Sequence, residues 1–100
     1  MKIDMQIKRL SAGFYIVETQ TNDNGELQEY NHTYEKSNSI FPLFRSLVLI
    51  LRELEGVEVE ITSNSDQFNE EMRTLDERNT SLVNMISDTV ERNNLTLKFS

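Results

Sequence analysis

Residues 40–61, IFPLFRSLVLILRELEGVEVEI, decide the fold, because the pattern changes from helical to extended around a single glycine. Residues 40–54 are apolar on most sides, which predicts the most buried helix of the protein. A narrow polar stripe is formed by Arg45, Ser46, Arg52 and Glu53. Pro42 lies in the first turn, where its missing N–H costs no hydrogen bond. Gly56 predicts the end of the helix, and the alternation over residues 57–61 predicts a strand. A strand that arrives after a helix is expected to pair in parallel with an earlier one.

Three extended segments precede this helix. The strongest turn signal of the chain is TNDNG at residues 21–25, where Asn-Gly favours positive φ and a hairpin. Ser37, Asn38 and Ser39 supply hydroxyl and amide side chains that are expected to cap the helix. The alternating or β-branched segments on either side of the turns are residues 2–10, 14–19 and 27–34.

Two more helices and a last strand follow residue 61. Phe68, Met72 and Leu75 are spaced for a short helix, a longer helix runs to about Arg92, and residues 95–99 alternate. The order is therefore βββ-α-β-α-α-β. The first, fourth and fifth strands each have one apolar and one polar side, so helices can cover only one face of the sheet. We predict an α/β two-layer sandwich, with a mixed five-stranded sheet and helices mainly on one face.

Composition limits the class of protein more than its role. One hundred residues, 37% hydrophobic and 27% charged, predict a single globular domain over residues 1–100. Seventeen acidic against ten basic residues leave a formal charge of −7, which disfavours direct binding to nucleic acids or anionic membranes. Without cysteine there is no disulfide or zinc–thiolate site. Residues 1–5 open directly into alternation, so we expect no signal peptide and a cytoplasmic protein.

Residues 38–44, residues 61–65 and residues 79–86 with 95–98, together with the order of elements, resemble the ribonuclease H-like fold. Residues 38–44 (NSIFPLF) resemble the start of that family's first helix, where an Asn pair precedes a catalytic Glu followed by Leu. Residues 61–65 (ITSNS) resemble the end of its fourth strand, normally a hydrophobic residue, Ser or Thr, a catalytic Asp and Ser. Residues 79–86 and 95–98 are similar to its later helix and fifth strand. The resemblance covers nearly the whole chain and implies a relative of two-metal nucleases.

The residues that carry the family's chemistry are missing. Pro42 stands where the helix should carry Glu, and Asn64 stands where the strand end should carry Asp. The matching part of the first strand, residues 6–8, has no acid, and the last acidic segment and final helix of the family have no counterpart. Two divalent ions need a cluster of carboxylates for phosphodiester cleavage. We therefore expect a truncated, catalytically inactive member, not an enzyme, with no metal or cofactor.

The open sheet face is the main candidate site. In one interpretation, its Lys and Glu side chains simply pair with each other at a solvated surface. In the other, the face is a docking surface for another protein or for a second copy of the chain. Both interpretations stay open. The residues expected there are Asp4, Gln6, Lys8, Glu58, Glu60, Thr96 and Lys98.

Two further functions are alternatives. In one interpretation, an acidic stretch is only the solvated face of a helix. In the other, the chain is an inhibitor whose carboxylates replace the phosphates that a nucleic-acid-binding protein recognises. A non-cleaving nucleic-acid binder would need a basic strip, which the spacing of the Lys and Arg residues does not form. Abundant Asn, Glu and Ile are typical of an AT-rich genome and point to a bacterium or its phage. The acidic residues are Asp66, Glu70, Glu71, Asp76 and Glu77.

Other chemistry has weaker support. Asp4, Glu60 and Asp66 are carboxylates that a fold could regroup around a metal, but Asp66 is better explained as stabilising the first turn of its helix. His32 is the only histidine, and we expect it to pack between Tyr30 and Tyr34 rather than to act as a general base.

Overall fold

Five strands form one mixed sheet in the order β3-β2-β1-β4-β5. The computed structural model describes residues 1–35, 37, 40–73 and 81–99. β1 is antiparallel to β2 and parallel to β4, and β4 is parallel to β5, so the predicted parallel crossover is confirmed. The strands are β1 (Lys2–Ser11), β2 (Phe14–Asp23), β3 (Glu26–Tyr34), β4 (Glu58–Ser63) and β5 (Thr96–Phe99).

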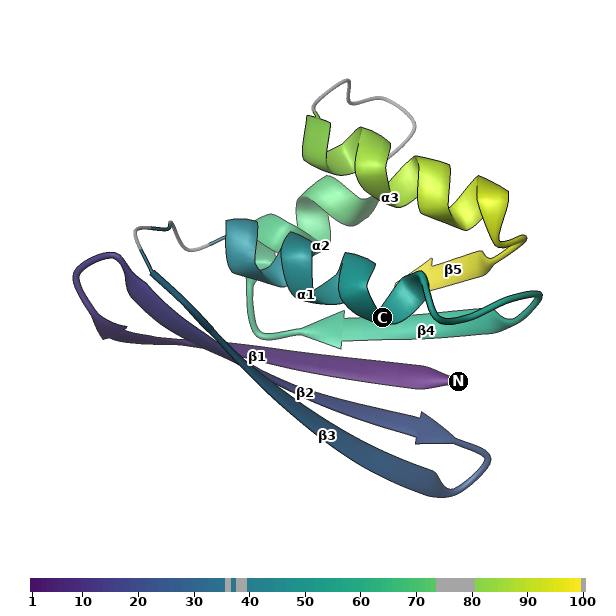
Figure 1. Ribbon diagram of the computed structural model, residues 1–100, viewed down its shortest axis with the longest axis horizontal. Helices are drawn as coiled ribbons and strands as arrows, with labels where there is room; N and C mark the ends of the chain where they lie inside the picture. The colour runs from purple at the N-terminus through teal and green to yellow at the C-terminus, as the bar shows by residue number, and fades with distance from the viewer. Residues whose placement is uncertain (36, 38–39, 74–80, 100) are drawn as a thin grey trace.

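Within the described residues, three helices lie on one side of this sheet (Figure 1). α1 (Phe41–Leu51) packs on β1 and β2, α2 (Asp66–Arg73) on β4 and β5, and α3 (Ser81–Arg92) on α1. The predicted α/β arrangement, a mixed five-stranded sheet with helices on one face, is therefore confirmed. The predicted extension of the second helix to Leu75 lies outside the described residues, as do Asp76, Glu77, Asn79 and Thr80.

The core fills the space between the sheet and the helices. Because strand side chains alternate between faces, Ile3 and Met5 are buried while Asp4 between them points to the other side. The rings of Phe44 and Phe68 join α1 to α2 edge to face, with centroids 5.0 Å apart and an interplanar angle of 64°. The largest buried side chains are Ile3, Met5, Val17, Leu43, Phe44, Leu47, Leu51, Val59, Ile61, Phe68, Met72 and Ile86.

The start of α1 differs from the prediction. Ile40 is the N-cap residue, and no side chain caps the helix there, while Pro42 lies in its first turn as expected. Ser37 does not cap either, since its hydroxyl is buried with no hydrogen-bond partner among the described residues. Asn38 and Ser39 lie outside the described residues. A proline in the first turn removes one of the backbone N–H groups that a cap would otherwise satisfy.

The end of α1 is held by Asn93, the residue that follows α3. Gly56 has φ +66°, the left-handed conformation that its position predicted, although the helix itself ends at Leu51. The side-chain amide of Asn93 donates hydrogen bonds to the carbonyl oxygens of Leu51, at 3.2 Å, and Arg52, at 3.1 Å. These bonds satisfy carbonyls that have no partner within the helix.

Ser46 was expected on the polar stripe of α1 but is fully buried. Its hydroxyl forms a hydrogen bond with the Tyr34 hydroxyl, with 2.7 Å between the oxygens. Burial removes the serine hydroxyl from water, and this hydrogen bond satisfies it.

The β2–β3 hairpin turns at Asn24 and Gly25, which have φ +53° and +91°. Positive φ at both central residues is typical of a type I′ turn, as the sequence predicted. The side-chain oxygen of Asn22 accepts a hydrogen bond of 2.9 Å from the backbone N–H of Gly25. The strands then pair without a shift in register from Asp23 opposite Glu26 to Tyr15 opposite Tyr34.

Candidate functional site: the open face of the sheet

The predicted face residues lie together on the side of the sheet away from the helices. Their strands are neighbours, and the register places Asp4 beside Thr62 and Glu60 beside Lys98. Glu70 and Glu71 lie on α2, in the helix layer, so the fold does not join them to this face. Glu77 lies outside the described residues. The sheet-face members are Asp4, Gln6, Lys8, Glu58, Glu60, Thr96 and Lys98.

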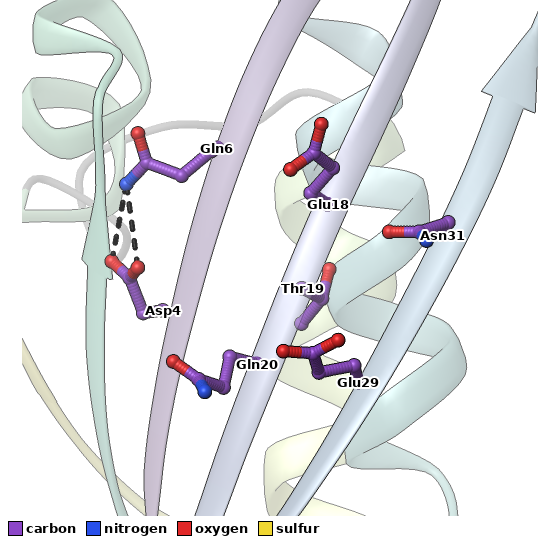
Figure 2. Close-up of a pocket in the computed structure, with 7 residues that line it drawn as sticks. All are labelled: Asp4, Gln6, Glu18, Thr19, Gln20, Glu29 and Asn31. Atoms are coloured by element: carbon purple, nitrogen blue, oxygen red, sulfur yellow. Dashed lines mark hydrogen bonds between the residues drawn. The ribbon is translucent and has the colours of Figure 1, made fainter.

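A shallow hollow of about 210 Å³ opens on this face across β1, β2 and β3. Figure 2 shows the carboxylates and amides that surround it, with Gln20 and Glu29 on neighbouring strands. The sequence analysis did not include the β2 and β3 members of this group. The alternation of Glu18 and Gln20 with buried Val17 and Thr19 was the signal that could have found them. The lining residues are Asp4, Gln6, Glu18, Thr19, Gln20, Glu29 and Asn31.

The carboxylate of Asp4 is held from two strands. The Thr62 hydroxyl on β4 donates a hydrogen bond of 2.6 Å to its Oδ1. The side-chain amide of Gln6 donates to Oδ1 at 3.3 Å and Oδ2 at 3.4 Å (Figure 2). Neutral donors therefore fix Asp4 as a hydrogen-bond acceptor beside the hollow.

Two lysines on the open face are paired with glutamates. Lys8 Nζ lies 3.0 Å from Glu18 Oε1, and Lys98 Nζ lies 2.8 Å from Glu58 Oε1. The hydrogen bond and charge of Glu58 raise the pKa of Lys98 above its ordinary 10.5. A raised pKa in the folded state makes this pair stabilising below pH 10.5, and the contribution is lost as the pH rises through the folded-state pKa. Because both pairs are exposed, they contribute little to folding but reduce the positive charge that the face offers.

Asn64, directly after β4, makes a pair of hydrogen bonds to the backbone of Ile7. Its Oδ1 accepts from the N–H of Ile7 at 2.9 Å, and its Nδ2 donates to the carbonyl oxygen of the same residue at 3.0 Å. The backbone N–H of Asn64 donates to the carbonyl of Met5 at 3.3 Å. The side chain therefore continues the pairing of β1 with β4 beyond Ser63, and it uses the amide both as donor and as acceptor.

Replacing Asn64 with aspartate is expected to lower the free energy of unfolding by about 1–2 kcal/mol. The carboxylate can still accept from the Ile7 N–H, but it has no donor and places a negative oxygen beside the Ile7 carbonyl. Urea unfolding at pH 7 measures the change. Asn22→Asp is the matched control, because Asn22 acts on Gly25 as an acceptor, which a carboxylate also provides. Equal losses in the two variants would contradict this role for the Asn64 amide.

The other candidate residues are not brought into a metal or catalytic cluster. Across residues 1–35, 37, 40–73 and 81–99, no group of three or more His, Asp or Glu side chains is placed to hold a metal ion. His32 lies on the helix side of β3, where it lines a second hollow with Tyr30 and α1. Its Nδ1 is buried and has no hydrogen-bond partner within the described part of the chain, so no carboxylate there orients the ring.

None of the helices in the described ranges is long and apolar enough to cross a membrane. The chain matches no protein-family model, and a comparison with curated proteins finds no significant match.

Proposed function

We propose that this chain is a ribonuclease H-like domain without nuclease chemistry that acts as a small protein-interaction module through its open sheet face. The strand order supports the resemblance, because β1 lies between β2 and β4 as the family resemblance implies. The main support for the loss of nuclease chemistry is the side chain of Asn64, whose amide forms hydrogen bonds with both the N–H and the C=O of Ile7. An uncharged side chain bound in this way is a poor ligand for a divalent cation.

The open face supports a protein partner better than a nucleic acid. Glu18 and Glu58 are paired with Lys8 and Lys98, so the net negative charge at the hollow comes from Asp4 and Glu29. Such a face repels phosphates and attracts basic side chains. We therefore propose that the partner presents lysine or arginine side chains to the hollow.

The loss of nuclease chemistry is tested with an RNA–DNA hybrid in the presence of Mg²⁺ or Mn²⁺. We expect no cleavage above the buffer control and no salt-sensitive binding of the hybrid at low ionic strength. Cleavage that is abolished by Asp4→Asn or Asp66→Asn would show a retained metal site and overturn the proposal. Binding of the hybrid without cleavage would instead establish the alternative of a non-cleaving nucleic-acid binder.

The interaction surface is tested with two charge-reversal variants of the full chain. Glu18→Lys changes the hollow, and Glu70→Lys changes α2 by the same substitution, since each of these exposed glutamates is one member of an ion pair. A partner that cross-links to the wild-type chain should be lost with the first variant and kept with the second. The reverse result would favour the acidic inhibitor that presents its helix carboxylates as substitute phosphates. Circular dichroism of both variants checks that the fold is retained.

A further inference from the structure

β3 is an edge strand whose outer backbone groups are open to a further strand. It is the last strand of the sheet on this side, and no other strand of the described chain pairs with it beyond β2. In a two-residue hairpin the residues flanking the turn, here Asp23 and Glu26, exchange both hydrogen bonds. From Glu26 onward, every second residue of β3 therefore forms backbone hydrogen bonds with β2. The backbone N–H and C=O groups of the residues between them point away from β2. The outward residues are Leu27, Glu29, Asn31 and Thr33.

Apart from the charges of Glu26 and Glu29, this edge lacks the features with which proteins usually block strand addition. The strand holds no lysine, no proline and no bulge, and its pairing with β2 is continuous over its whole length. Leu27 is 59% exposed and Tyr30 is 38% exposed, so apolar side chains stand on both sides of the open backbone. β5, at the opposite edge, is shorter and carries Lys98.

We infer that β3 pairs antiparallel with β3 of a second copy of this chain, on a two-fold axis at Tyr30. This register uses the whole strand, because it places Glu26 opposite Tyr34 of the second copy. It aligns the outward-directed residues with one another, which provides about eight backbone hydrogen bonds between the copies. The two five-stranded sheets become one continuous sheet.

The side chains select a second copy in this register. On the open face, Glu29 lies opposite Asn31 of the second copy, and the two-fold axis repeats this carboxylate–amide pair. A shift of the axis to Glu29 would instead place two carboxylates opposite each other, which is unfavourable. On the helix face, Tyr30 meets Tyr30 of the second copy at a position where cross-strand side chains lie closest. The strand is therefore complementary to itself.

Glu29 and Asn31 belong both to the hollow and to this register, but self-association is measured without any other partner, so either proposal can fail alone. It is tested by sedimentation equilibrium of the full chain at about 0.15 M NaCl, where the charge of −7 on each copy is largely screened. We expect a reversible monomer–dimer equilibrium with a dissociation constant on the order of 10 µM.

Three variants test the register. Asn31→Glu places like charges opposite Glu29 twice in the dimer, so the dissociation constant should rise about tenfold. Asn31→Pro removes an outward N–H without touching the bonds to β2 and should also weaken the dimer. Gln67→Glu, the control, makes the same charge change at an exposed position of α2 and should leave the equilibrium within about twofold.

Hydrogen exchange provides a second measurement. The amides of Leu27, Glu29, Asn31 and Thr33 should become protected as the concentration rises, while Asn31→Glu should keep them in fast exchange. A wild-type chain that stays monomeric to about 1 mM would overturn the inference. A dimer that both Asn31 variants leave unchanged would also overturn it, because the contact would then lie elsewhere on the molecule.

Discussion

Replacing Phe44 with alanine is expected to lower the free energy of unfolding by about 3–5 kcal/mol. Phe44 is 1% exposed and packs edge to face against Phe68, so the substitution removes a core ring and the aromatic contact that joins α1 to α2. The substitution would leave a cavity between the helices and the sheet. The strands cannot move to fill this cavity without breaking their pairing. For a domain of this size the loss is a large part of the total stability.

Chemical denaturation followed by circular dichroism measures this change. Phe14→Ala is the matched control, since the same side chain is removed from a position that is 39% exposed, and its effect should stay below about 1 kcal/mol. A loss for Phe44→Ala no larger than that of the control would contradict the packing of α1 against α2.

Replacing Ile3 with aspartate is expected to cost more than about 4 kcal/mol and to leave little folded protein at 37 °C. Ile3 is 1% exposed between the sheet and the helices, and its side chain is surrounded by apolar groups. A carboxylate there must be buried without a partner or take up a proton, and both options destabilise the folded state.

At the neighbouring position, Asp4, a substitution should change the free energy of unfolding much less. Asp4→Ile loses the hydrogen bonds from Thr62 and Gln6, but Asp4 lies on the open face, so the cost should stay within about 1 kcal/mol. Thermal unfolding of the two variants compares the faces of β1 directly. Similar destabilisation of both would contradict a sheet that is covered on one side only.

Much of the fold could be predicted because alternation and helical spacing are properties of short segments. The alternation of residues 57–61 predicted β4, and TNDNG at residues 21–25 predicted the β2–β3 turn, since few residues adopt the positive φ found at Asn24 and Gly25. The start of α1 was predicted less well, because a cap depends on whether a side chain reaches the first turn.

The candidate site was predicted only in part. Asp4, Gln6 and Lys8 followed from the alternation of one strand, whereas the hollow also needs Glu18 and Glu29 from β2 and β3. Which residues of these strands lie side by side depends on the register, which a reading of each segment alone does not provide. Ser46 was assigned to a polar stripe because the partner that allows its burial, Tyr34, is on another element.

By itself, the sequence determined which side of β1, β4 and β5 faces the core and where the main helix and the hairpin turn lie. These features arise from the intrinsic geometry of a few consecutive residues. The tertiary structure decided that Asn64 completes the pairing of β1 with β4, that three strands share one acidic hollow, and that β3 is left as an open edge. Each depends on contacts between residues far apart in the chain, and such contacts are fixed only when the sheet and the helices pack together.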